Sequence, residues 1–199
     1  MSVQIYFLIS LFVFSLMLVG IGVWITSSNR YLGILIDSRN KMSLSRFQIV
    51  MWTLLITSAI VAYVLATGST GFTLPTEVWA MLGISLGSTA GAVIVKGNKN
   101  AKDSTHKPPD DGEASLADLF KGEEPNDHKY VDIAKVQMFF FSLVALVGYF
   151  IAVWIWFGTD GEKGVAIGVF PALSAQLVTI LGISHAGYLT VKAAPKGPQ

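Results

Sequence analysis

Long apolar runs alternate with shorter polar segments along this chain. A helix rises about 1.5 Å per residue and a bilayer's hydrocarbon core is about 30 Å thick, so roughly 20 apolar residues suffice to cross it. Five runs approach or exceed that length, and we expect them to form helices over 3–26, 46–67, 75–95, 134–157 and 165–191. The pattern predicts an all-α integral membrane protein with five transmembrane helices.

Two pairs of runs are joined by short links, 68–74 and 158–164. Helices joined so closely run antiparallel, so we predict two hairpins and an extra N-terminal helix. The expected organisation is an N-terminal transmembrane helix at 1–26, a cytoplasmic or interfacial connector at 27–45, a first hairpin repeat at 46–95, a cytoplasmic loop at 96–131, a second hairpin repeat at 132–192 and a disordered tail at 193–199.

The two hairpins resemble each other in sequence. Aligned without gaps, 75–96 and 171–192 share Pro, Ile, Ser, Ala, Gly, Val and Lys at matching positions. A second alignment, of 43–64 with 132–153, places Gln48 opposite Gln137. Both hairpins enter from the same side of the membrane, so we expect parallel tandem copies related by a pseudo-twofold axis along the membrane normal.

The basic residues lie on one side of the predicted bundle. Apart from Lys163, every Lys and Arg falls in the connectors after the first and third runs, in the C-terminal tail, or at the helix ends beside them. The positive-inside rule puts these segments in the cytoplasm. We therefore expect an inner-membrane protein with its N-terminus outside and its C-terminus in the cytoplasm.

Composition narrows the function classes. A net charge of +1 provides no large field to attract nucleic acid. The chain has no Cys, and its runs contain neither paired carboxylates nor a His cluster. An intramembrane enzyme is therefore disfavoured, and we expect no cofactor and no metal.

Polar residues within the apolar runs are the candidates for function. Gln48 and Gln137 lie about one turn inside the cytoplasmic boundary, where a buried amide needs partners, and the repeat pairs each with Ser184 or Ser88. His185, whose counterpart is Thr89, is the one ionisable residue well inside a run. Both a packed structural role and a polar pathway remain open. The pathway candidates are His185, Ser184, Thr89, Ser88, Gln48, Gln137 and Glu77.

Glu77 lies in the first turn of the third run, where a carboxylate complements the helix dipole. It is either an interfacial residue or, in an oligomer, part of an outer ring that attracts cations.

Small residues and basic residues each form a pattern. Gly83, Gly87 and Gly91 recur every fourth residue, with Gly187 matching the last of them, which favours close helix packing within the chain or between copies.

The basic residues at the cytoplasmic helix ends form a predicted ring that contacts lipid headgroups or, alternatively, selects anions. They are Arg46, Lys135, Lys96 and Lys192.

Two segments carry a family resemblance. The stretch Gly33–Gln48, continuing through Trp52 and Thr53, is similar to an uncharacterised group of bacterial multi-pass membrane proteins, as is Leu181–Tyr188. The resemblance implies a bacterial membrane protein and carries no activity or site residues.

Two functions are consistent with these patterns. One is an oligomeric channel or pore, favoured by the repeated hairpins, the glycine pattern and the polar residues within runs. The other is a membrane anchor or scaffold that recruits a soluble protein through residues 115–124, where Ser115–Asp118 resembles a capping box. The expected partners are the lipid bilayer and further copies of the chain.

Overall fold

The computed structural model describes residues 1–26, 31–37, 40–102, 114–123, 127–159 and 168–194. Over these residues it is all-helical, without a strand longer than an isolated bridge. The long helices are α1 (Val3–Thr26), α2 (Leu44–Thr67), α3 (Thr76–Lys102), α4 (Ile133–Thr159) and α6 (Ala175–Ala193), with short 3-10 turns η1 (Gly33–Leu35) and η3 (Leu116–Leu119).

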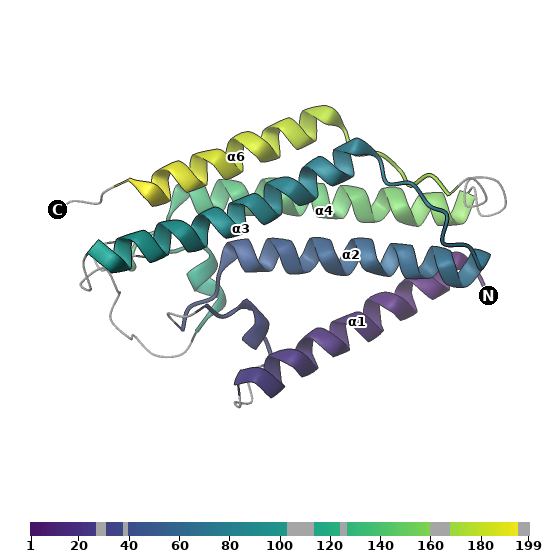
Figure 1. The fold of residues 1–199 in the computed structure, drawn as a ribbon, viewed down its shortest axis with the longest axis horizontal. Coiled ribbons are helices and arrows are strands. Elements are labelled where there is room, and N and C mark those ends of the chain that lie inside the picture. Colours follow the sequence, from purple (N-terminus) through teal and green to yellow (C-terminus); the bar gives the residue numbers. More distant parts are fainter. Residues whose placement is uncertain (27–30, 38–39, 103–113, 124–126, 160–167, 195–199) are drawn as a thin grey trace.

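Helices α2, α3, α4 and α6 lie side by side as a four-helix unit (Figure 1). Within it α2 packs against α3 and α4, and α6 packs against α3 and α4. Helix α1 lies outside the unit, mainly against α2. Each predicted hairpin therefore contacts the other through both of its helices.

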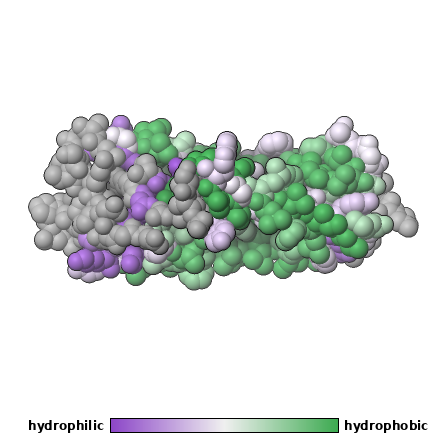
Figure 2. Space-filling model, turned by 90° about the horizontal axis from the view of Figure 1, so that it is seen from below, coloured by the Kyte–Doolittle hydropathy of each residue, from purple (hydrophilic) through white to green (hydrophobic). Residues whose placement is uncertain are grey.

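Four helices in the described part of the chain are long and apolar enough to cross a membrane. These are the segments Val3–Ile25, Leu44–Thr67, Thr76–Lys99 and Ile133–Gly158. Large apolar side chains cover their outer faces, among them Phe12 at 66% and Trp24 at 81% exposed. Figure 2 shows this apolar surface along most of the length, with hydrophilic residues gathered towards one end. Such a surface is unfavourable in water and favourable in lipid.

The fifth predicted span differs from expectation. We expected a helix over 165–191 with Pro171 near its start, but α6 begins only at Ala175. The backbone at Phe170 instead donates a hydrogen bond to Thr73 O at 3.0 Å, and a residue before proline avoids the helical region. Ser174 then caps the helix by accepting the Leu177 N–H at 3.4 Å. The resulting 19-residue helix is not among the four that meet the length and apolarity of a span, so a fifth span stays a prediction.

A parallel bridge joins the segments that precede α3 and α6. Thr73 N donates to Gly168 O at 2.7 Å and Phe170 N donates to Thr73 O at 3.0 Å. Gly168 has φ +67°, and a Cβ there would lie 2.6 Å from Gly71 O, so only glycine fits. The bridge pairs Thr73 with Val169, and the alignment of Pro75 with Pro171 makes these two positions equivalent.

Buried positions recur between the hairpins in a definite register. Gln48 corresponds in burial to Met138, 90 positions on, and not to Gln137, which is exposed. The matching buried pairs of α2 and α4 are Ser45 and Lys135, Gln48 and Met138, Trp52 and Ser142, Leu55 and Ala145, Ile56 and Leu146, Ala59 and Tyr149, and Tyr63 and Val153. The alignment of 43–64 with 132–153 pairs residues 89 positions apart, so it does not match buried positions with buried positions; a shift of one residue does. One residue turns a helix by about 100°, enough to move Gln137 out of the core.

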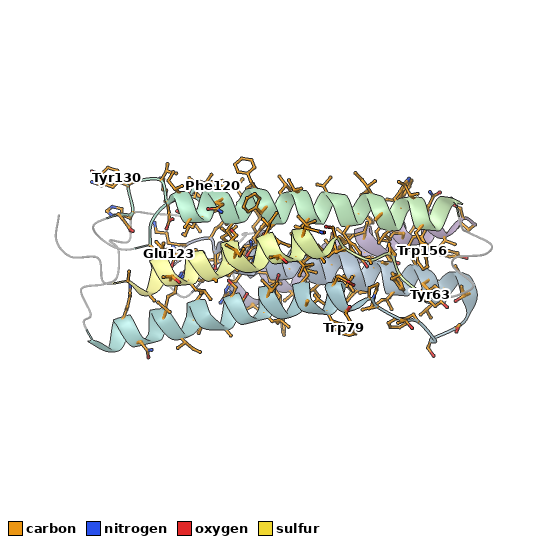
Figure 3. All side chains as sticks on the ribbon, turned by 90° about the horizontal axis from the view of Figure 1, so that it is seen from above. Tyr63, Trp79, Phe120, Glu123, Tyr130 and Trp156 are labelled. Atoms are coloured by element: carbon orange, nitrogen blue, oxygen red, sulfur yellow. The ribbon has the colours of Figure 1, made fainter. Side chains whose placement is uncertain are left out.

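Buried apolar residues form two clusters. The large one contains Trp52, Tyr149 and Phe170 and fills most of the bundle. The small one lies towards the end where α2 and α4 begin and contains Met42, Leu44, Ala92, Leu119, Met138 and Tyr188. Figure 3 shows Phe120 and Glu123 at that end and Tyr63 and Trp156 towards the other.

Candidate functional site

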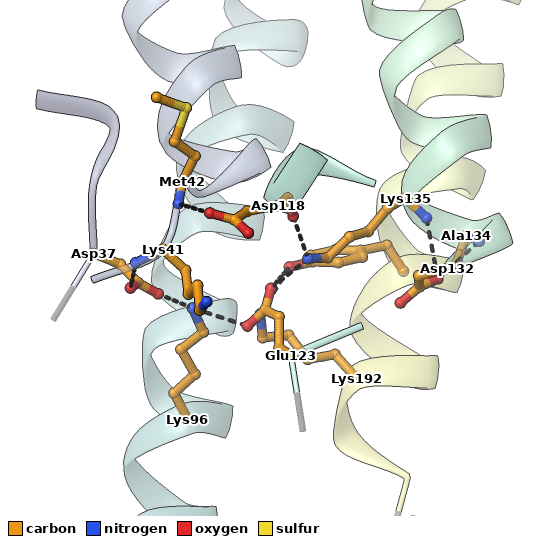
Figure 4. Close-up of polar contacts among 11 residues, drawn as sticks. Asp37, Lys41, Met42, Lys96, Asp118, Glu123, Asp132, Ala134, Lys135 and Lys192 are labelled. Atoms are coloured by element: carbon orange, nitrogen blue, oxygen red, sulfur yellow. Dashed lines mark hydrogen bonds and ion pairs between the residues drawn. The ribbon is translucent and has the colours of Figure 1, made fainter. Parts of the chain in front are cut away.

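Three lysines from three helices converge on one carboxylate at the end of the bundle where α2 and α4 begin (Figure 4). Glu123 Oε2 lies 2.9 Å from Lys96 Nζ of α3 and 2.6 Å from Lys192 Nζ of α6. Glu123 Oε1 lies 3.1 Å from Lys135 Nζ of α4. Tyr188 adds a hydroxyl that donates to Glu123 Oε1 at 3.3 Å. We call Glu123 and these three lysines the lysine–glutamate cluster.

The segment that carries Glu123 is folded against the bundle. Ser115 and Asp118 form the predicted capping box, and Asp118 Oδ2 also accepts the Met42 N–H at 3.3 Å. Leu119 is 3% exposed within the small apolar cluster, and the Phe120 ring lies 4.9 Å from that of Phe139. Residues 115–123 therefore cover the end of the four-helix unit, and we call them the covering segment.

The cluster sets the ionisation of Glu123. Burial by itself would raise the pKa of this carboxyl, but Lys135, Lys192 and Lys96 together hold the pKa well below its usual range. Glu123 is therefore ionised at neutral pH. Its charge offsets part of the repulsion among three ammonium groups that share one site.

The basic residues do not form an outward ring. Lys135 is 2% exposed and also donates to Asp118 O at 3.3 Å, and Lys96 pairs with Asp37 as well as with Glu123. Arg46 is exposed, and its Nη1 donates to Ile36 O at 2.7 Å. The three lysines thus have carboxylate partners inside the protein, whereas a headgroup contact for any of the four stays a prediction.

A layer of buried polar residues separates the two apolar clusters. On each helix of the four-helix unit these residues lie between a member of the large cluster and a member of the small one. They are Gln48 of α2, Ser85 and Ser88 of α3, Ser142 of α4, and Ser184 and His185 of α6. We call this set the polar layer. It brings together Gln48, Ser88, Ser184 and His185, four of the candidates expected from sequence.

The polar layer is only partly hydrogen-bonded. Gln48 Nε2 donates to Ser142 Oγ at 2.5 Å and to Met138 O at 3.4 Å. The buried atoms Gln48 Oε1, Ser88 Oγ, Ser184 Oγ and His185 Nδ1 have no hydrogen-bond partner. Each such atom costs about 1–3 kcal/mol relative to a satisfied one.

Two expectations about these residues are wrong. Gln48 pairs with Ser142 rather than Ser184, because α2 faces α4 at this level. Gln137 is exposed and lies outside the polar layer.

Glu77 lies in the first turn of α3 as expected, at the opposite end of the helix from Lys96. Its Oε2 accepts the Thr76 hydroxyl at 3.3 Å.

Thr89 lies at the edge of the layer. It is half-buried, and its hydroxyl bonds Ser85 O of its own helix at 2.8 Å and Ser45 O of α2 at 3.3 Å.

The glycines divide into two kinds. A Cβ at Gly91 would lie 3.0 Å from Leu189 Cδ1, so this glycine lets α3 approach α6. A Cβ at Gly83, Gly87 or Gly187 would meet nothing within 4 Å. Of these four glycines, only Gly91 is needed for packing within the chain. Contact between copies stays a prediction for Gly83, Gly87 and Gly187.

Sequence reasoning missed Glu123, Ser142 and Tyr188. Glu123 is one of many acids in a polar loop, and nothing near it in sequence marks it as a partner of three helices. Ser142 carried a weak signal, because it follows an aromatic residue near the start of an apolar run, as Thr53 does. No group of three or more His, Asp or Glu suited to a metal occurs among the residues that the structure describes.

Four long apolar helices, three of which surround a buried polar layer together with α6, are consistent with a multi-pass membrane protein. No family model matches the chain, and no curated protein or solved structure matches it.

Proposed function

We propose that this chain is a channel-type membrane protein. In this proposal a polar pathway enters the four-helix unit from the cytoplasmic end, and the covering segment closes it there. The polar layer is the observation that supports it most directly, since all four helices place buried polar side chains at one level and several of their atoms lack partners. A pathway for water or ions would supply the missing partners when open.

The lysine–glutamate cluster supports a gate at the cytoplasmic mouth. Glu123 is the one residue of the covering segment that bonds α3, α4 and α6 together. Release of this carboxylate would free Leu119 and uncover the small apolar cluster. The large apolar cluster must also part for ions to cross, so this structure corresponds to the closed state of the proposed channel.

Burial decides where the proposed pathway runs. Ser184 and His185 are 5% and 4% exposed and lie inside the four-helix unit. The pathway that we propose therefore runs through each unit, and not between copies. Copies would associate through the exposed glycines Gly83 and Gly87 of α3.

Reconstitution into planar bilayers tests the proposal. We expect Glu123→Gln to raise the current above that of the wild type, and Glu77→Gln, at the other end of α3, to leave it unchanged. When the pathway is open and water reaches His185, this residue should titrate, so His185→Gln should flatten the pH response of the current between about pH 5 and 8 without altering assembly. If wild type and Glu123→Gln both pass no current at any voltage or pH, the channel proposal fails.

A scaffold is the second candidate, and it has an observation of its own. Leu116 of the covering segment is 61% exposed, and the neighbouring Tyr130 and Val131 are 69% and 61% exposed. Leu119 already packs inside the small apolar cluster, so it is not open to a partner. The proposed partner of residues 115–124 would contact the three exposed side chains. A Leu116→Asp variant should then lose a co-purifying soluble protein while keeping its own fold.

A further inference from the structure

The charged groups of the lysine–glutamate cluster do not balance (Figure 4). Glu123 contacts all three lysines, and Asp37 pairs with one of them, Lys96. Among the described residues, three ammonium groups thus share two carboxylates, and none of these side chains is more than 18% exposed. A surplus positive charge in a site with so little solvent is unfavourable, and the loss of one proton would remove it.

Other charged groups near the cluster do not remove this surplus. Asp118 Oδ2 accepts backbone N–H groups at 2.8 and 3.3 Å, and Asp132 Oδ1 accepts two more at 3.0 and 3.3 Å. Within the part of the chain that the structure describes, neither carboxylate forms an ion pair with a cluster lysine. Lys99 of α3 adds a further positive charge near the end of α6, where it donates to Ala194 O at 3.0 Å.

Lys192 is the cluster lysine whose charge is least compensated. Lys96 contacts both carboxylates of the cluster region. Lys135 contacts one carboxylate and a backbone carbonyl oxygen, and it lies beside Asp132 at the start of α4. Within the described residues, Lys192 has one carboxylate, at 2.6 Å, and the Tyr188 hydroxyl, at 2.8 Å. That hydroxyl is itself bonded to the same carboxylate.

Burial and repulsion both act against the charge of Lys192. The residue follows the predicted span 165–191 and lies in the last turn of α6. Burial is the main cause that lowers its pKa, and the ammonium groups of Lys96 and Lys135 lower it further. The Glu123 carboxylate offsets only part of these effects, so the pKa falls from 10.5 to about 7.

We propose that Lys192 makes the covering segment a pH-sensitive closure. When the segment leaves, the site loses the attraction of Glu123, but water also reaches Lys192. Relief of burial is the larger of these two effects, so the open form binds a proton more tightly than the closed form. Proton binding therefore favours release, and proton loss favours closure.

The sign of the pH dependence follows from this difference in proton affinity. The closed form should gain stability as the pH rises from about 7 towards 10.5, and Lys192 should contribute no change at lower pH. The importance of this closure for a gate rests on the proposed channel. The pH dependence of the closure itself does not.

Hydrogen exchange of the full chain in lipid nanodiscs tests the proposal through the backbone amides of residues 115–123. Protection factors are corrected for the intrinsic pH dependence of exchange, so they report how often the segment opens. One proton that binds only the open form changes the ratio of closed to open by up to about tenfold per pH unit. We therefore expect wild-type protection to rise by at least about tenfold between pH 7 and 9.

Three substitutions identify the group that titrates. Lys192→Met keeps a long side chain without its ammonium group, so protection should no longer change between pH 7 and 9. Lys96→Met removes a neighbouring positive charge, so the pKa of Lys192 should increase and the rise in protection should begin at higher pH. Lys121→Met removes an exposed lysine of the covering segment that is outside the cluster, and it should keep the wild-type profile.

Two results would overturn the proposal. One is wild-type protection that stays constant from pH 7 to 9. The other is a rise that Lys192→Met retains, which would mean that another group titrates. If Lys192→Met does not fold, Lys96→Met decides, because the titration of a distant group would stay at the same pH. A wild type that shows the predicted rise but passes no current would support this closure and refute the channel alone.

Discussion

The ammonium group of Lys135 lies 3.1 Å from the carboxylate of Glu123, and only 2% of the lysine side chain is exposed. A lysine so deeply buried needs an anion beside it. Lys135 is in the first turn of α4 and Glu123 is in the covering segment, so this ion pair ties the segment to the helix. Lys96 and Lys192 attach the same carboxylate to α3 and α6.

Replacement of Glu123 by Gln should destabilise the protein. Three lysines would then share a site without that carboxylate, and we expect a loss on the order of 2 kcal/mol, below the usual range for buried pairs because Glu123 is 18% exposed. Thermal unfolding in detergent measures the change. Glu77→Gln is the matched control, and an equal loss of stability in both variants would contradict the role of the cluster.

The same carboxylate predicts an acid limit to stability. Because the folded-state pKa of Glu123 is held well below its usual range by the lysines, its contribution is complete above the unfolded-state pKa of about 4.3. The contribution is lost as the pH falls from there through the folded-state pKa. Tm should therefore be insensitive to this group at neutral pH and fall in strong acid. In Glu123→Gln, that part of the acid dependence should be missing when Tm is measured against pH.

Two serines of the polar layer should respond in opposite ways to truncation. Ser142→Ala removes the 2.5 Å acceptor of the buried Gln48 amide and should cost about 1 kcal/mol. Ser184→Ala removes a buried hydroxyl without a partner and should be neutral or stabilising by up to about 1 kcal/mol. Denaturation of both variants in one detergent compares them directly. Equal destabilisation would mean that Ser184 is hydrogen-bonded in the membrane.

Gly87→Leu tests association between copies. A Cβ at Gly87 meets nothing within 4 Å, so the monomer should fold and unfold as the wild type does. If copies pack through this face of α3, the leucine keeps their backbones apart and the oligomer dissociates. Light scattering of the detergent-solubilised protein gives the subunit number. An unchanged oligomer would exclude this face, and a lower Tm of the monomer would mean that the residue packs within the chain.

Cysteine labelling tests the predicted orientation, and the native chain contains no cysteine to interfere. Ser69→Cys, in the exposed link between α2 and α3, should react with an impermeant reagent added to sealed cells. Lys121→Cys, exposed at the opposite end, should react only after the cells are opened. The same is expected at Ser104, which lies outside the described residues. The reverse labelling pattern would invert the topology.

Apolar runs predicted the helices well because length and composition alone decide whether a segment can cross a membrane. Four of the predicted spans are long apolar helices, and α3 begins at Thr76, one residue after the start expected at Pro75. The start of α6 was less predictable, because it depends on the backbone pairing of Thr73 with the segment around Val169. Backbone hydrogen bonds of this kind do not depend on which residues are apolar, so the hydrophobic pattern could not predict them.

Side-chain partners were harder to predict than helices. Gln48 and Gln137 match in type, yet one is buried and the other exposed, because a one-residue difference in register turns a helix by about 100°. Glu123 was beyond prediction for another reason. Its partners come from three helices far apart in sequence, and a polar, glycine-containing loop is usually mobile rather than folded against a bundle.

The bridge between Thr73 and Val169 has a consequence for biosynthesis. A chain is synthesised from its N-terminus, so the first hairpin is complete well before residue 168 has been translated. Until then the Thr73 backbone groups and the inward faces of α2 and α3 lack the partners that α4 and α6 supply. Assembly of the four-helix unit is therefore complete only after α6 has been synthesised. If the predicted insertion holds, a nascent chain that ends before α6 would expose polar groups to lipid, a feature by which membrane quality control could recognise it as incomplete.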